Sequence, residues 1–116
     1  MDIADKRNVR RLKVNLPVTF EQMGLPKGFG ETVAKDLSTT GLKINMRFFS
    51  PSNTFFTVKV KLPEVSRVIE SQAQVVWSQR ISYSDQYQTG LRFSEMNPVF
   101  QRWLEEYIQI NETLEK

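Results

Sequence analysis

The sequence contains neither cysteine nor histidine among its 116 residues. Without cysteine, the chain cannot form a disulfide framework, a thiolate metal site or a thiol nucleophile. Without histidine, it lacks the commonest general base and the commonest ligand of transition metals, and a Ser-His-Asp relay cannot be assembled. The acidic residues form no dense cluster of the kind that Mg²⁺ or Ca²⁺ sites need. These absences favour binding over catalysis, and we expect neither an enzyme nor a metal or organic cofactor.

Long apolar segments are also missing. No run reaches the roughly 18 apolar residues that a membrane-spanning helix needs, and the N-terminus has no apolar signal-peptide stretch. We therefore expect a cytoplasmic protein that is not inserted in a membrane. The hydrophobic content of 40% and the charged content of 25% are ordinary for a globular protein, and the length fits one domain with a modest core.

Positive charge is concentrated near the N-terminus. The formal net charge is +3, and five of the eight residues from position 6 to 13 are basic: Lys6, Arg7, Arg10, Arg11 and Lys13. Residues 1–11 have no apolar periodicity, which predicts a flexible basic arm. Such an arm suits an anionic partner such as a phosphate, a nucleic acid or a lipid.

Residues 12–96 have the pattern of a small all-β unit. Apolar and polar residues alternate in several short segments separated by turn residues, which is typical of strands in a closed barrel or a sandwich. The predicted strands are residues 12–20, 31–37, 42–46, 56–62, 67–80 and 88–93. In the segment 67–80, Ala73, Val75 and Trp77 fall on one face, and we predict that all three point into the core.

Residues 97–113 have helical periodicity instead. Asn97 is a good N-cap and Pro98 a good first helical residue. The apolar residues recur at helical spacing and form one stripe: Phe100, Trp103, Leu104, Tyr107 and Ile108. A helix must bury such a stripe, so it should lie across a barrel mouth or against a partner. The chain is therefore expected to be a monomer or a weak homodimer formed through this helix.

The turn "DLSTTG", residues 36–41, admits two interpretations. In a purely structural turn, Asp36 and Ser38 bond nearby backbone amides and Gly41 adopts a positive φ. In a binding turn, the Asp36 carboxylate accepts hydrogen bonds from N1 and N2 of a guanine, while Ser38 and backbone amides contact phosphate or sugar. Arginines from the basic arm would then bind phosphate or stack on a base.

Two motifs together make the chain resemble PilZ domains. The stretch "RNVRR" reads R-x-x-x-R from Arg7 to Arg11, and D-x-S-x-x-G begins 25 residues after Arg11 at Asp36. Three further stretches are similar to the same family: "LPV" at 16–18, "AQVVW" at 73–77 and "GLRF" at 90–93. Each motif alone is weak evidence, and R-x-x-x-R is common by chance in any basic stretch, but the order and spacing of the pair are specific.

The resemblance implies a mostly β fold: a six-stranded antiparallel β-barrel with a C-terminal α-helix, which binds the bacterial second messenger cyclic di-GMP. It also implies which residues contact this ligand: Arg7, Arg11, Asp36, Ser38 and Gly41. Lys6 and Arg10 are secondary candidates, because extra cations favour an intercalated pair of ligands with four phosphodiester charges. Binding would order the arm and signal to a protein effector.

Two alternatives from other classes remain open at this point. The first is a small barrel that binds single-stranded nucleic acid, for which Phe48, Phe49 and Phe55 are the candidate stacking residues. The second is a PilZ-like scaffold that binds proteins without a ligand. These phenylalanines do not interleave with basic residues as a stacking platform would, which argues against nucleic acid as the partner. The intact arginines and the intact turn argue against the ligand-independent scaffold.

Overall fold

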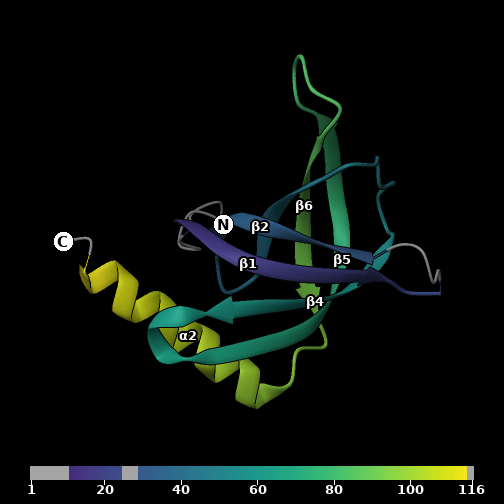
Figure 1. Ribbon diagram of the computed structural model, residues 1–116. Helices are drawn as coiled ribbons and strands as arrows, with labels where there is room; N and C mark the ends of the chain where they lie inside the picture. Colours follow the sequence, from purple (N-terminus) through teal and green to yellow (C-terminus); the bar gives the residue numbers. More distant parts are fainter. Residues whose placement is uncertain (1–10, 25–28, 115–116) are drawn as a thin grey trace, which may run out of the picture.

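The computed structural model describes residues 11–24 and 29–114, and it forms a closed antiparallel barrel with one long helix (Figure 1). The strands follow each other around the barrel in the order β1-β2-β3-β6-β5-β4. Their bounds are β1 Leu12–Gln22, β2 Phe29–Leu37, β3 Gly41–Met46, β4 Phe55–Leu62, β5 Arg67–Arg80 and β6 Tyr87–Ser94, with a short 3₁₀ turn η1 at Pro63–Val65 and the helix α2 at Pro98–Leu114. The predicted six-stranded antiparallel barrel with a C-terminal helix is confirmed.

Alternation along the strands determines which side chains fill the barrel. Along β1, for example, Leu16, Val18 and Phe20 are buried while the residues between them are exposed. Because a closed barrel has an inside and an outside, the buried residues of all six strands contribute to one shared core. The β5–β6 hairpin extends beyond the other strands at the top of Figure 1.

The prediction that Trp77 points into the core is wrong. Trp77 is 40% exposed, whereas Ala73 and Val75 are buried as expected. The pairing of β5 with β6 shifts between Val75 and Trp77, so a bulge breaks the alternation and leaves both Val76 and Trp77 facing outward. The indole instead covers Gly90 of β6, where a side chain would collide with it.

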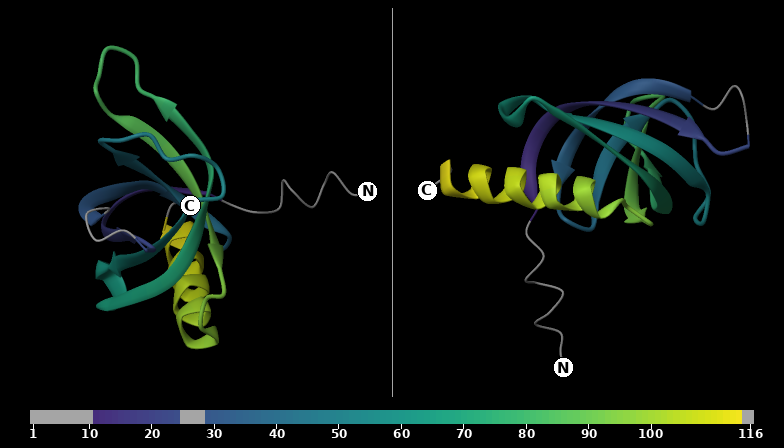
Figure 2. Two further views of the ribbon diagram at one scale, coloured as in Figure 1. Left: turned by 90° about the vertical axis from the view of Figure 1, so that its right-hand side faces the viewer. Right: turned by 90° about the horizontal axis from the view of Figure 1, so that it is seen from below.

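The helix α2 buries its apolar stripe against the barrel of the same chain. Leu104, Tyr107 and Ile108 are buried, and the helix packs on β5 and β1 (Figure 2). The predicted cap is present, since the amide of Val99 donates to Oδ1 of Asn97 at 2.8 Å.

Arg67, the first residue of β5, also holds the helix. Its guanidinium lies 4.6 Å from the ring centroid of Trp103 and 3.6 Å from Oε1 of Glu106.

Across residues 11–24 and 29–114, no helix is both long and apolar enough to span a bilayer.

Tyr107 makes the attachment of α2 sensitive to alkaline pH. Burial, reinforced by a hydrogen bond to Glu64, raises the pKa of Tyr107 to about 12. An unfolded chain has a tyrosine pKa of about 10, so the neutral phenol stabilises the fold fully below pH 10, and this contribution is lost as the pH rises towards 12. We expect the free energy of unfolding to fall by about 1–3 kcal/mol more in the wild type than in Tyr107→Phe across this window.

Urea unfolding at several pH values measures this difference. Tyr83→Phe changes a tyrosine that is fully exposed in the β5–β6 hairpin and should follow the wild-type curve. Parallel curves for wild type and Tyr107→Phe would show that the Tyr107 hydroxyl does not couple folding to pH.

Candidate functional site

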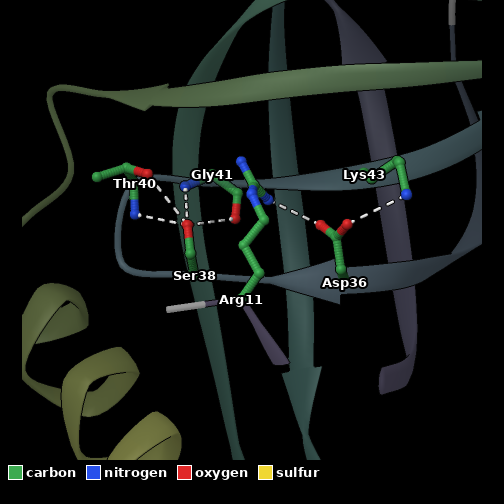
Figure 3. Close-up of polar contacts among 6 residues, drawn as sticks. All are labelled: Arg11, Asp36, Ser38, Thr40, Gly41 and Lys43. Atoms are coloured by element: carbon green, nitrogen blue, oxygen red, sulfur yellow. Dashed lines mark hydrogen bonds and ion pairs between the residues drawn. The ribbon is translucent and has the colours of Figure 1, made fainter. Parts of the chain in front are cut away.

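The turn between β2 and β3 is built around the side chain of Ser38. The Ser38 amide donates to the carbonyl of Gly41 at 2.9 Å, and its Oγ accepts the amides of Thr40 and Gly41 at 3.1 and 3.2 Å (Figure 3). Ser38 is fully buried. Its hydroxyl therefore shapes the turn from within, as the structural interpretation predicts, and its Oγ is not presented at the surface.

Gly41 is required for a different reason than the one expected from the sequence. The expectation of a positive φ is wrong, because Gly41 does not lie in the left-handed region. Instead, a Cβ at this position would overlap the backbone carbonyl oxygen of Leu91 on β6. The neighbouring bond from the Phe93 amide to the Thr40 carbonyl, 2.8 Å long, holds the turn against the same strand.

Asp36 lies between two cations at the end of β2. Its Oδ1 accepts a hydrogen bond from Nη1 of Arg11 at 2.8 Å, and its Oδ2 lies 3.3 Å from Nζ of Lys43 (Figure 3). The Asp36 side chain is 15% exposed, compared with 49% for Arg11 and 30% for Lys43. The fold thus joins the last arginine of the R-x-x-x-R motif to the first residue of the D-x-S-x-x-G motif.

Lys43 was missed by the sequence analysis. It is the cross-strand partner of Asp36 in the β2–β3 pair. Side chains directly opposite each other on neighbouring antiparallel strands lie on the same face of the sheet and interact. Treating residues 36–43 as a hairpin closed by the turn would have placed Lys43 beside Asp36.

The pair belongs to a row of residues that crosses five strands of the barrel. Lys13 pairs with Asp36, Asp36 with Lys43, Lys43 with Gly90, and Gly90 with Trp77. Because the Trp77 indole lies over Gly90, it occupies the space that a β6 side chain beside Lys43 would otherwise fill. The outer face therefore presents a carboxylate, an ammonium and a half-exposed aromatic ring in sequence.

The other predicted site residues belong to the basic N-terminal arm. Lys6, Arg7 and Arg10 lie outside the described residues. Arg80, which belongs to neither motif, is the last residue of β5, where its Nε donates to the carbonyl of Ser84 in the β5–β6 hairpin at 2.9 Å. Among residues 11–24 and 29–114, no three His, Cys, Asp or Glu residues are arranged to hold a metal ion.

The phenylalanines considered for nucleic-acid stacking are engaged separately. Phe48 packs edge-on against Phe20, with the ring centroids 6.2 Å apart, and Phe49 packs against Tyr87 at 6.0 Å. Phe55 is at the start of β4 and is 38% exposed. These rings therefore do not share one stacking surface.

The row that contains Asp36, Lys43 and Trp77, here called the Asp36 row, lies on the outer face of the barrel. A concavity of about 550 Å³ lies at the other ends of β2 and β3, lined in part by Phe29, Thr32, Asn45 and Gln86. On the Asp36 row, by contrast, the charged residues of both motifs meet, since Arg11 and Lys43 each contact Asp36. The row is therefore the candidate site, and Arg11 connects it to the basic N-terminal residues.

The family model of the PilZ domain matches residues 5–109. Several solved structures share the fold. Bacillus subtilis MotI/DgrA, an inhibitor of motility, has a TM-score of 0.79 and 23% identity, with 96% of this chain and 52% of that chain covered. Klebsiella MrkH in its apo state has a TM-score of 0.72 and 19% identity, covering 99% and 52%. The chain thus spans about half of the length of these two relatives.

A third structure is of a PilZ domain with its ligand. The PilZ domain of Escherichia coli YcgR, solved with c-di-GMP, has a TM-score of 0.65 and 16% identity, with 96% of this chain and 98% of that chain covered. No curated protein matches the chain.

Gly41→Ala tests the close packing of the turn on β6. The new methyl group would overlap the Leu91 carbonyl, so the turn must shift, and we expect a loss of about 1–3 kcal/mol in the free energy of unfolding. Thr40→Ala, at the exposed neighbouring position, should cost less. Equal stability of Gly41→Ala and wild type in urea unfolding would show that the turn does not depend on this contact.

Proposed function

Because the chain belongs to the PilZ domain family, we propose that it is a receptor for cyclic di-GMP, bound between the basic arm and the turn at residues 36–41. The observation that carries the proposal is the 2.8 Å contact between Arg11 and Asp36, since it brings the two motifs together. The presence of c-di-GMP in the YcgR PilZ domain supports the choice of ligand.

Each group at the site suits one part of this ligand. The Asp36 carboxylate can accept the N1 and N2 hydrogens of one guanine, while Arg7 and Arg11 bind the phosphodiesters through charge-assisted, bidentate hydrogen bonds. The half-exposed Trp77 ring, in the same row as Asp36, offers a flat surface on which a base can stack. Ser38 and Gly41 then act by positioning the turn, not by direct contact.

Ligand binding would work as an exchange of partners for Arg11. Without ligand, Arg11 forms an ion pair with Asp36. With ligand, Arg11 would bind a phosphate, and the guanine would donate its hydrogen bonds to the Asp36 carboxylate. Arg7, Lys6 and Arg10 follow on the same arm, which becomes ordered around the ligand and presents a new surface to a protein effector. The role is that of a cytoplasmic adaptor without catalysis, monomeric or weakly dimeric through α2.

Three substitutions test the site. Arg7→Ala, Arg11→Ala and Asp36→Ala should each weaken cyclic di-GMP binding by roughly ten- to a hundredfold, which corresponds to about 1.5–3 kcal/mol for a lost charged hydrogen bond. Isothermal calorimetry measures the affinity. Arg80→Ala removes an exposed arginine outside both motifs, whose Nε is bonded within the β5–β6 hairpin, and should bind as wild type does.

Competition separates this function from its alternatives. If single-stranded RNA displaces the ligand as well as unlabelled cyclic di-GMP does, the chain is a nucleic-acid binder. If the wild type gives no heat with cyclic di-GMP and no thermal shift, it is a ligand-independent scaffold. If Arg7→Ala unfolds the domain and leaves the affinity intact, the arm has a structural role only.

The same titration reports the number of ligands. We propose an intercalated pair of cyclic di-GMP molecules, because Lys6 and Arg10 add cations beside the two motif arginines. Lys6→Leu should lower the stoichiometry from two towards one while binding is retained. Saturation of the wild type at one ligand per chain would mean that Lys6 is only a solvated residue of the arm.

A further inference from the structure

We infer that Lys43 reads the O6 atom of the guanine held by Asp36 and so makes the site selective for guanine. The inference rests on the proposed function and adds to it a residue that lies outside both motifs. It begins from the position of the Lys43 ammonium, 3.3 Å from Oδ2 of Asp36 on the neighbouring strand.

The order of groups at the site matches the order of groups on a guanine edge. The Watson–Crick edge of guanine presents the O6 acceptor, then the N1 donor, then the N2 donor. The site presents the Lys43 donor, then Oδ2 of Asp36, then Oδ1 on the side of Arg11. A guanine whose N1 and N2 donate to Oδ2 and Oδ1 therefore has its O6 on the side of Lys43.

Lys43 can make this contact without leaving Asp36. An ammonium has three hydrogens, and each carboxylate oxygen accepts more than one hydrogen bond. Nζ can thus donate to Oδ2 and to O6 together, while Oδ2 also accepts the N1 hydrogen. The Lys43 side chain is 30% exposed, so it is accessible from solvent but supported along its stem by the sheet.

The neighbours of Lys43 keep its ammonium near the carboxylate. Its partner on β6 is Gly90, which has no side chain to compete with Asp36 for the ammonium, and the Trp77 indole covers that glycine. Asp36, on the other side, is the acid directly opposite on β2. The donor is therefore placed before the ligand arrives, which reduces the entropy lost on binding.

Adenine is rejected by the same pair. Its edge places an amino group beside Lys43 and a lone pair at N1 beside Oδ2, so a donor meets a donor and an acceptor meets an acceptor. A site built to hydrogen-bond one edge discriminates strongly against a base that leaves its polar groups unpaired. Asp36 alone would select a base with a hydrogen on N1, whereas Lys43 would also select a base with an acceptor at position 6.

The decisive experiment changes that one atom and that one side chain together. Calorimetry of the full chain with cyclic di-GMP and with its 6-thioguanine analogue, in which sulfur replaces O6, gives an affinity ratio for each variant. Sulfur is a weak acceptor, so the wild type should lose about tenfold in affinity for the analogue. Lys43→Met should bind cyclic di-GMP about tenfold more weakly than the wild type and lose most of the discrimination.

Two further variants separate recognition from charge. Lys43→Arg keeps a hydrogen-bond donor and should restore much of the wild-type ratio between the affinities for cyclic di-GMP and for its 6-thioguanine analogue. Lys59→Met removes the same charge from an exposed position on β4, which borders neither β2 nor β3, and should keep the wild-type ratio. Thermal unfolding of each variant verifies the fold.

The outcomes distinguish the inference from the function on which it rests. If Lys43→Met weakens both ligands equally and leaves the ratio unchanged, Lys43 contributes only charge and the inference is wrong, while cyclic di-GMP binding stands. If the wild type binds neither ligand, the proposed function fails and Lys43 has no base to read. A ratio that collapses in Lys43→Met and returns in Lys43→Arg supports the inference.

Discussion

The candidate site depends on one interaction: Arg11 and Lys43 share the carboxylate of Asp36. Arg11 approaches one oxygen from the N-terminal arm, and Lys43 approaches the other from β3. Exposed ion pairs of this kind contribute about 0–1 kcal/mol each, so the fold can release Arg11 at little cost. The Lys43 contact is better supported, because both residues belong to paired strands. Lys43 is thus held beside Asp36 by the sheet, whereas Arg11 lies just before β1 and is the cation that the proposed function requires to change partners.

This arrangement requires that the turn between β2 and β3 be rigid. The buried hydroxyl of Ser38 satisfies two backbone amides, and Gly41 allows the backbone to approach Leu91 on β6. Had either residue carried a larger side chain, the register of Asp36 against Lys43 would change. The motif residues Ser38 and Gly41 are therefore explained by the geometry they impose on Asp36, even though neither presents a group to the surface that a ligand would need.

Much of the barrel could be predicted because inside and outside alternate along a strand with a period of two, and the chain follows that period in β1, β3 and β4. The outward position of Trp77 could not be predicted, because a bulge changes the alternation without any change in residue type. Val75, Val76 and Trp77 are all apolar, and only the pairing with β6 decides which face of the sheet each one occupies. The contact between Arg11 and Asp36 could be expected from the sequence, because each residue belongs to a motif. The position of Lys43 beside Asp36 could not, because it follows from the register of two strands.

The row that crosses the strands places charged groups and an aromatic ring side by side on one face of the barrel. A sheet brings residues that are distant in the sequence into line at the strand spacing of about 4.8 Å, so Asp36, Lys43 and the indole of Trp77 lie at successive positions on one face. Hydrogen-bonding groups at one end of such a row can read the edge of a base, and an aromatic ring at the other can hold the face of a base. In the proposed function, the basic residues that precede β1 supply further positive charge for the phosphates of the ligand. The proposed function therefore divides the work: the paired strands would provide selectivity for the base, whereas the basic residues before β1 would provide affinity for phosphate and the signal to another protein.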